Sequence, residues 1–300
     1  MSVLVAGTIA IDDIKTPTTA HKNLLGGSAC YAAISASYFA PTVLQGIVGH
    51  DFPAEHVETL KKHGVDLSGV EHSDGKTFYW SGEYFDDLNT RETLDVQLNV
   101  IEDYHPKLDE SVAKSKIVLL ANMSPVTQME VLQQCHADFI IADTMDLWIN
   151  VTLEPLKALI EKIDLLILND SEAKQLAGTN NLITAGNRLL EMGSKYVVIK
   201  KGEHGSMLFA KNHFFTCGAF PLHEVLDPTG AGDTFAGALA GYLAKSEGVV
   251  SFKDLCQGVV QGTVMASFVC EAFSTKMLHE LDDAKIQARY DEFIRYTQVI

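Results

Sequence analysis

Short apolar segments alternate with segments of helical length along most of this chain, and this alternation constrains the fold more than any other feature. The first apolar segment, Val3–Ile9, predicts a buried strand. Comparable strands are predicted at Val43–Val48, Ile117–Ala121, Phe139–Ala142, Leu165–Leu168 and Tyr196–Lys200. Helices are predicted at Gly27–Phe39, Thr234–Lys245 and Ser251–Val269, and from a cap at Asp51 to about His63. Strands that alternate with helices form a parallel sheet covered on both faces, so we expect an α/β fold.

One section departs from this alternation. Two strands are predicted at Lys76–Glu83 and Thr90–Asn99, joined by a turn at residues 86–89. The first of them carries the aromatic residues Phe78, Tyr79 and Trp80. Such a hairpin can be an appendage with an aromatic packing face, a lid over a ligand, or a surface through which two copies form a homodimer. The residues alone leave these three interpretations open.

The charge balance excludes several classes of protein. The 300 residues include 23 Lys and Arg against 39 Asp and Glu, which gives a formal net charge of −16. Proteins that bind the phosphate backbone or anionic lipid need a basic face, so we expect no nucleic-acid partner and no membrane partner. Anionic small molecules stay compatible with this charge, provided that the site attracts anions locally.

The cysteines and the N-terminal residues predict a cytoplasmic protein. The five cysteines are widely spaced and include no Cys-x-x-Cys, which favours buried, reduced thiols over disulfides or a structural zinc site. No basic region precedes the first apolar run, so this run indicates a strand and not a signal peptide. No apolar stretch approaches the ~20 residues that are needed to span a bilayer.

The segment Asp227–Asp233, with the sequence Asp-Pro-Thr-Gly-Ala-Gly-Asp, is the most informative part of the chain. Gly230 and Gly232 allow backbone N–H groups to turn toward a ligand, and the helix that follows offers further N–H groups and the positive end of its dipole. Together these features predict a phosphate site. The loop lacks the Lys of a P-loop, and Phe235 stands where a dinucleotide-binding fingerprint needs its third glycine.

Asp233 adds a proton acceptor to this anion site. A carboxylate is expected there if it takes the proton from a hydroxyl that attacks a bound phosphate. The structural alternative is that Asp233 only caps the helix.

The eleven residues from Asp227 to Gly237, DPTGAGDTFAG, resemble the C-terminal signature of the PfkB/ribokinase family. The resemblance implies that Asp233 is the catalytic base and that the amides of Gly230, Ala231 and Gly232 form an anion hole. It implies ATP-dependent phosphorylation of an alcohol group, with ATP and Mg²⁺ as cofactors and a small-molecule alcohol as the partner.

The same resemblance implies the architecture. The expected fold is a ribokinase-like three-layer sandwich, with a mostly parallel central sheet, helices on both faces and a small β lid. The chain is then a single domain, residues 1–300, with the lid inserted at about residues 12–26 and 76–99.

Residues in the first half of the chain resemble the family's acceptor side. Asp12 resembles the aspartate that binds substrate hydroxyls, and its structural alternative is a solvated turn. Gly26 and Gly27 resemble the pair at the hinge between lid and core, and their alternative is a loop before a helix. Tyr31 occupies a substrate-binding position where many sugar kinases of the family have Asn, which weakens an assignment as ribokinase or fructokinase.

Residues in the second half resemble the nucleotide side. Asn169 and Glu172 resemble the family's Asn-x-x-Glu, which organises Mg²⁺ and ATP phosphates through water; the alternative is a capping box. The turn containing Lys200, Gly202 and Gly205 resembles the family's ATP-binding turn, and its alternative is a hairpin with solvated lysines. These positions follow one another in the order that the family shows.

The preceding residues favour a kinase that phosphorylates a hydroxyl of a sugar or sugar-derived substrate. A nucleoside kinase of the same family is the alternative, and a non-catalytic regulator that binds ATP or sugar is a further one. Asp227 and Thr229 resemble positions that hold a monovalent cation such as K⁺ in some members. Polar or aromatic residues that follow or end predicted strands are further pocket candidates: Asn99, Asn122, Asp143 and Trp148, with Arg91 as a candidate for an anionic substrate group.

Overall fold

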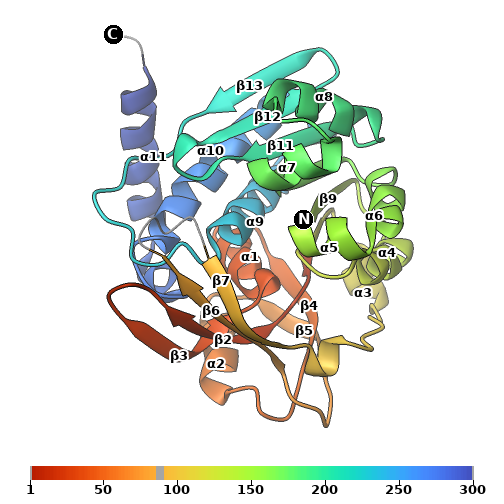
Figure 1. The fold of residues 1–300 in the computed structure, drawn as a ribbon, viewed down its shortest axis with the longest axis vertical. Coiled ribbons are helices and arrows are strands. Elements are labelled where there is room, and N and C mark those ends of the chain that lie inside the picture. The colour runs from red at the N-terminus through yellow and green to blue at the C-terminus, as the bar shows by residue number, and fades with distance from the viewer. Residues whose placement is uncertain (1, 86–90, 299–300) are drawn as a thin grey trace.

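The computed structural model describes residues 2–85 and 91–298, which form two sheets and the helices around them (Figure 1). Among these residues the central sheet has nine strands, in the order β13-β12-β11-β10-β9-β8-β1-β4-β5. Its strands are β1 (Val3–Ala6), β4 (Thr42–Val48), β5 (Asp66–His72), β8 (Ile117–Leu120), β9 (Phe139–Asp143), β10 (Leu165–Asn169), β11 (Tyr196–Lys200), β12 (Ser206–Ala210) and β13 (His213–Cys217). Neighbours from β11 to β5 are parallel, and β12 and β13 add an antiparallel pair at one edge.

Alternate side chains of the central strands enter two separate hydrophobic cores. Val3 and Val5 belong to one core, and Leu4 and Ala6 belong to the other. Because successive side chains of a strand point to opposite faces, this division shows that both faces are buried. Helices with residues in the first core are α1 (Ser28–Ser37), α2 (Ala54–Lys62), α9 (Ala231–Leu243), α10 (Phe252–Val269) and α11 (Asp283–Thr297). Those in the second are α3 (Glu110–Ala113), α4 (Pro125–Gln134), α5 (Asp146–Val151), α6 (Leu153–Ile160), α7 (Asp170–Ala177) and α8 (Leu182–Glu191).

A smaller sheet is built from two segments that are far apart in the sequence. Its order is β3-β2-β6-β7, with β2 (Ala10–Lys15), β3 (Ala20–Gly26), β6 (Phe78–Tyr84) and β7 (Arg91–Gln97). Strands β6 and β7 pair antiparallel, as predicted, whereas β2 and β6 pair parallel. The turn predicted at residues 86–89 lies outside the described residues. Figure 1 shows this sheet at the lower left.

The close packing of α9 against α1 depends on two glycines. A Cβ on Gly237 would lie 2.1 Å from the carbonyl oxygen of Ala32, and one on Gly241 would lie 2.6 Å from that of Ala36. The two helices therefore meet backbone to backbone, which holds the loop before α9 at the carboxyl edge of the sheet. Three short 3₁₀ turns complete the described chain: η1 (Asn99–Ile101), η2 (Gly202–His204) and η3 (Lys276–Glu280).

The predicted cap of one helix is wrong, whereas the predicted start of another helix is confirmed. Asp51 does not cap α2, whose N-cap position is Pro53. The Oδ1 atom of Asp51 instead accepts a 2.7 Å hydrogen bond from the backbone N–H of Thr77, which joins the loop after β4 to the start of the small sheet. Helix α10 begins as predicted, with Ser251 at its N-cap in a capping box. In the part of the chain that is described, no helix is long and apolar enough to cross a membrane.

Candidate active site

The loop before α9 lies where the parallel strands end. Gly230 adopts a left-handed conformation with φ 76°, and a Cβ there would lie 2.3 Å from the ring of Tyr31. Only glycine satisfies both conditions, so the turn into α9 requires this residue. The amide of Ala231 donates to the carbonyl of Pro228 at 3.2 Å, so this member of the predicted anion hole is engaged within the loop. Gly232 and Asp233 follow in the first turn of the helix.

Asp227, at the start of the same loop, holds the loop in place. Its side chain is fully buried, and its two oxygens accept backbone N–H bonds from Thr229 at 2.9 Å and from Ser274 at 3.1 Å. Burial raises the pKa of this carboxyl despite those bonds. The hydroxyl of Thr229 donates to the hydroxyl of Tyr84 at 3.0 Å, which ties the loop to strand β6 of the small sheet. Asp227 and Thr229 thus hold the loop in place, and a monovalent cation beside them stays a prediction.

Asp12 is a buried acid on the small sheet. It is 4% exposed, and burial, together with the nearby charges of Asp227 and Asp233, raises its pKa to about 8. A Cβ on Gly26 would lie 2.1 Å from its carboxyl group, and Gly27, with φ 89°, supplies a backbone hydrogen bond to it. The two adjacent glycines thus make room for this carboxyl, which is largely protonated at neutral pH.

Tyr31 lies inside the molecule. Its side chain is 1% exposed and packs beneath Gly230, and burial raises the pKa of its hydroxyl well above the ordinary value. The residue therefore supports the anion loop from α1. A direct contact with substrate, as predicted from its position in the sequence, stays a prediction.

The predicted nucleotide side forms around the ends of β10 and β11. Asn169 caps α7: its Oδ1 accepts from the amide of Glu172 at 2.9 Å, and Oε2 of Glu172 accepts from the amide of Asn169 at 2.7 Å. The capping box is therefore real. Burial and the neighbouring charge of Asp143 raise the pKa of Glu172 to about 7. A divalent cation would favour the ionised form of this carboxyl, and carboxylate and amide oxygens are ligands that Mg²⁺ prefers, so the residues fit the implied metal.

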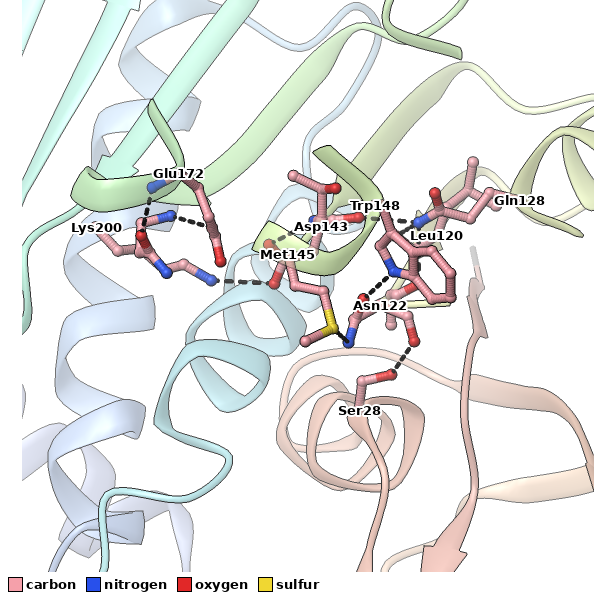
Figure 2. Close-up of polar contacts among 12 residues, drawn as sticks. Ser28, Leu120, Asn122, Gln128, Asp143, Met145, Trp148, Glu172 and Lys200 are labelled. Atoms are coloured by element: carbon pink, nitrogen blue, oxygen red, sulfur yellow. Dashed lines mark hydrogen bonds and ion pairs between the residues drawn. The ribbon is translucent and has the colours of Figure 1, made fainter. Parts of the chain in front are cut away.

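Lys200 reaches from the end of β11 across this edge. Its Nζ lies 3.0 Å from Oδ2 of Asp143 (Figure 2). The same Nζ lies 2.9 Å from where a Cβ on Gly232 would be. Burial disfavours its charge, but the carboxylates of Asp143, Glu172 and Asp233 outweigh that cost and raise its pKa. Lys200 is thus a largely buried cation beside the first turn of α9, with its side chain 18% exposed, and the alternative of a solvated lysine is wrong for this residue.

The turn after β11 has a structural need for glycine. Gly202 has φ 53° and Gly205 has φ 78°. A Cβ on Gly205 would lie 2.0 Å from the carbonyl oxygen of Cys217 at the end of β13. The backbone of this turn therefore approaches β13 closely, and its contact with a nucleotide stays a prediction.

A second polar cluster, around Asn122, lies at the same edge of the sheet, and the sequence did not indicate that its residues contact one another. Asn122 accepts from the indole N–H of Trp148 at 2.8 Å and donates to the sulfur of Met145 at 3.1 Å. The backbone carbonyl of Asn122 accepts a 2.9 Å hydrogen bond from the hydroxyl of Ser28, as Figure 2 shows. Asn122 and Trp148 were candidates because they follow strand ends, but nothing in the sequence indicates that they bond to each other. The side-chain amide of Asn99 donates a hydrogen bond to the backbone carbonyl of Thr77. The side chain of Arg91, the other candidate, lies outside what the structure describes.

The model of the pfkB family of carbohydrate kinases matches residues 7–282, and the chain belongs to that family. The protein is therefore an ATP-dependent phosphotransferase with a hydroxyl group as acceptor, built on a three-layer α/β sandwich.

Curated relatives include kinases of both nucleosides and sugars. The chain is 27% identical over 250 residues to the cytidine kinase of Thermococcus kodakarensis. This alignment covers 81% of this chain and 88% of that protein. It is 28% identical over 243 residues to a ribokinase of Staphylococcus aureus, covering 76% and 77% of the two chains.

Among solved structures, the nucleoside kinase of Methanocaldococcus jannaschii superposes with a TM-score of 0.77 at 19% identity, over 97% of this chain and 98% of that one. A fructokinase of Vibrio cholerae, with fructose, ADP and calcium bound, also gives 0.77, at 17% identity over 96% and 98%. At these identities the superpositions support the three-layer fold and leave the acceptor open.

Proposed function

We propose that the protein phosphorylates a hydroxyl on the sugar of a nucleoside, with Asp233 as the catalytic base. The observation that carries this proposal is the place of Asp233. Its charge raises the pKa of Asp12 on the small sheet and that of Lys200 on the nucleotide side, so it lies within electrostatic range of both. Asp233 is therefore near enough to act on a predicted acceptor residue and on a predicted donor residue, which supports its assignment as the base.

The chemistry follows from that position. When bound, MgATP supplies the phosphoryl group, and the metal offsets part of its negative charge. Asp233 accepts the proton of the acceptor hydroxyl. At the same time the hydroxyl oxygen bonds to the γ-phosphorus of ATP, and the bond from that phosphorus to the leaving ADP oxygen breaks. The amides at the start of α9 and the Lys200 ammonium stabilise the charge on the transferring group. Asp12, largely neutral at pH 7, can donate as well as accept a hydrogen bond with a sugar hydroxyl.

The small sheet offers a flat aromatic surface beside Asp12. Trp80 pairs with Asp12 in the register of β6 and β2, so their side chains share one face of the sheet. The indole of Trp80 lies over Gly82, where a Cβ would come within 2.2 Å of the ring, and its N–H donates to Thr93 at 3.3 Å. The half-buried ring is therefore held flat against the sheet.

A flat ring next to a hydroxyl-binding carboxyl suits an acceptor that joins a planar base to a sugar, because aromatic faces stack. The sequence similarities to a curated cytidine kinase and a curated nucleoside kinase support the same class. A free sugar is the second candidate, supported by the similarity to a ribokinase. We propose that the small sheet acts as a lid that covers either acceptor and excludes water.

The test is a panel of nucleosides and free sugars assayed for acceptor-dependent ADP release. We expect turnover of nucleosides, and a loss of about 10²–10⁴-fold in kcat for Asp233→Asn with acceptor binding retained. Asp283→Asn is the matched control, because Asp283 is also in the first turn of a helix, α11, but is exposed on that helix. Turnover of free sugars alone would refute the nucleoside assignment, and full activity of Asp233→Asn would refute the base.

A further inference from the structure

Lys200 owes its position to a second residue, Asp143. Lys200 is the last residue of β11 and pairs with Asn169 in the register of β10, so it leaves the sheet at the edge that carries α9. A lysine side chain of this length can point in many directions, and ordering it costs up to ~2 kcal/mol of conformational entropy. Its ion pair with Asp143, at 3.0 Å, is the contact that selects one direction.

Asp143 is a rigid anchor for that contact. Its side chain is 4% exposed, and its Oδ1 accepts from the amide of Thr144 at 3.0 Å. Its carbonyl accepts from the side-chain amide of Gln128 at 2.9 Å. The same Gln128 nitrogen also donates to the carbonyls of Leu120 and Ala121, so it joins the ends of β8 and β9 (Figure 2).

The ammonium group of Lys200 lies beside the first turn of α9. Its Nζ lies 2.9 Å from the position that a Cβ on Gly232 would occupy, so Gly232 is the residue that leaves room for the ammonium. An ammonium has three donor protons, and Asp143 accepts one of them. The others are available for phosphate oxygens that arrive at the N-terminus of this helix.

The carboxylates around Lys200 create a need for its positive charge when a phosphoryl group approaches. Asp143, Glu172 and Asp233 all act on Lys200, so carboxylates outnumber basic groups in this cluster. A phosphoryl group that approached the helix without Lys200 would meet negative charge. In a chain with a net charge of −16, the cation must be placed accurately, because basic residues are few.

We propose that Asp143 is a positioning residue for phosphoryl transfer, because it directs the Lys200 ammonium to the first turn of α9, where the ammonium meets the charge of the transferred phosphoryl group. This inference rests on the proposed kinase function of the same site. Asp143 itself contacts Lys200 and the backbone, and its charge also raises the pKa of Glu172. The effect on the reaction that we assign to Asp143 is the one that passes through Lys200.

A double-mutant cycle tests the proposal, with Asp143→Asn, Lys200→Met and the double variant. Three quantities are measured: kcat and KM, the Kd of a non-hydrolysable ATP analogue with Mg²⁺, and the free energy of unfolding. We expect Lys200→Met to weaken analogue binding and to lower kcat by about 100-fold or more, as for loss of a transition-state charge partner. Asp143→Asn should lower kcat by about 10-fold with the KM for the acceptor unchanged, and Asp143→Glu should restore part of it.

The double variant separates positioning from a structural role. Asp143→Asn alone leaves a largely buried ammonium with a weaker partner and is expected to destabilise the fold, whereas the double variant removes both charges and should regain stability. Under the proposal it regains no activity and no analogue affinity, because the cation is gone. Recovery of activity together with stability would overturn the proposal. So would a 10-fold loss from Asp143→Asn that persists in the Lys200→Met background.

Lys195→Met is the matched control. Lys195 begins the same stretch of chain at the opposite edge of the sheet, where its Nζ lies 2.6 Å from Oδ1 of Asp164. Its side chain is 71% exposed, so we expect no change in analogue binding. If the wild-type protein turned over no acceptor, the proposed function would fail, whereas analogue binding and stability across the cycle would still decide the role of Asp143.

Discussion

Replacing Asp12 by Asn is expected to make the protein more stable at alkaline pH. The carboxyl of Asp12 has an ordinary pKa of 3.8 and a pKa of about 8 in the folded chain, chiefly because of burial. Between these values the folded protein holds a proton that the unfolded chain has released. Stability therefore falls as the pH rises from about 4 to about 8, and the loss is complete above the folded pKa.

The magnitude follows from the size of the shift. A difference of about 4 pH units at ~1.4 kcal/mol per unit sets a ceiling of about 6 kcal/mol. Relaxation around an ionised carboxylate reduces that ceiling, so we expect a cost of at least ~2 kcal/mol at pH 9. Asn has nearly the same shape and carries no charge, so Asp12→Asn avoids this cost. Near pH 5, where Asp12 is protonated, the variant and the wild type should be similar in stability.

The assay is urea unfolding at pH 5, 7 and 9, followed by circular dichroism, for the wild type and Asp12→Asn. The difference in unfolding free energy between the two proteins should grow in favour of the variant as the pH rises. Asp13→Asn is the control, because Asp13 is the next residue along β2, points to the other face of the strand and is only half-buried. A difference between Asp12→Asn and wild type that is the same at pH 5 and pH 9 would refute the reasoning.

Two further predictions concern the anion loop and the small sheet. Gly230→Ala should destabilise the fold by more than ~2 kcal/mol in thermal unfolding, because its Cβ would lie 2.3 Å from the Tyr31 ring at a positive φ. Gly248→Ala, which has φ 82° but nothing within 4 Å, should cost only about 1 kcal/mol, and equal costs would contradict the steric argument. Strand β7 is at the edge of the small sheet and exposes Leu94 and Val96 by 52% and 51%, so we expect a homodimer through this strand that Lys at both positions converts to a monomer. A wild-type monomer in light scattering at micromolar concentration would refute that expectation.

The positions of the central strands were predictable because they depend on local pattern. Strand β11 begins and ends where the apolar run from Tyr196 to Lys200 predicts. The other predicted central strands differ from the structure by no more than a few residues at their ends, whereas β5 was not predicted. The family resemblance singled out Asn169, Glu172 and Lys200, and the structure brings them to one edge of the sheet, since parallel strands end together there. The antiparallel pair β12 and β13 was not predicted, because its short strands follow a glycine-containing turn that resembles a loop.

The use of each polar side chain was much less predictable. Asp51 follows a strand and precedes a helix, a sequence typical of an N-cap, yet it bonds to the backbone of Thr77, 26 residues away. Trp80 is one of several aromatic residues in its strand, and only the register with β2 places it on the same face as Asp12. These pairings depend on which segments meet, and no local signal records that.

By itself, the sequence determined the class of fold, the family and the edge of the sheet that carries the chemistry. Apolar periodicity, the glycines before α9 and the residues at strand ends are local properties, and they act before any tertiary contact forms. Only the tertiary structure decided how the charges of the site are arranged: an acid at Asp12 with a pKa of about 8, and a cation at Lys200 held by Asp143 from 57 residues away. Charges act through space and through the burial around them, so their states are set where separate parts of the chain meet.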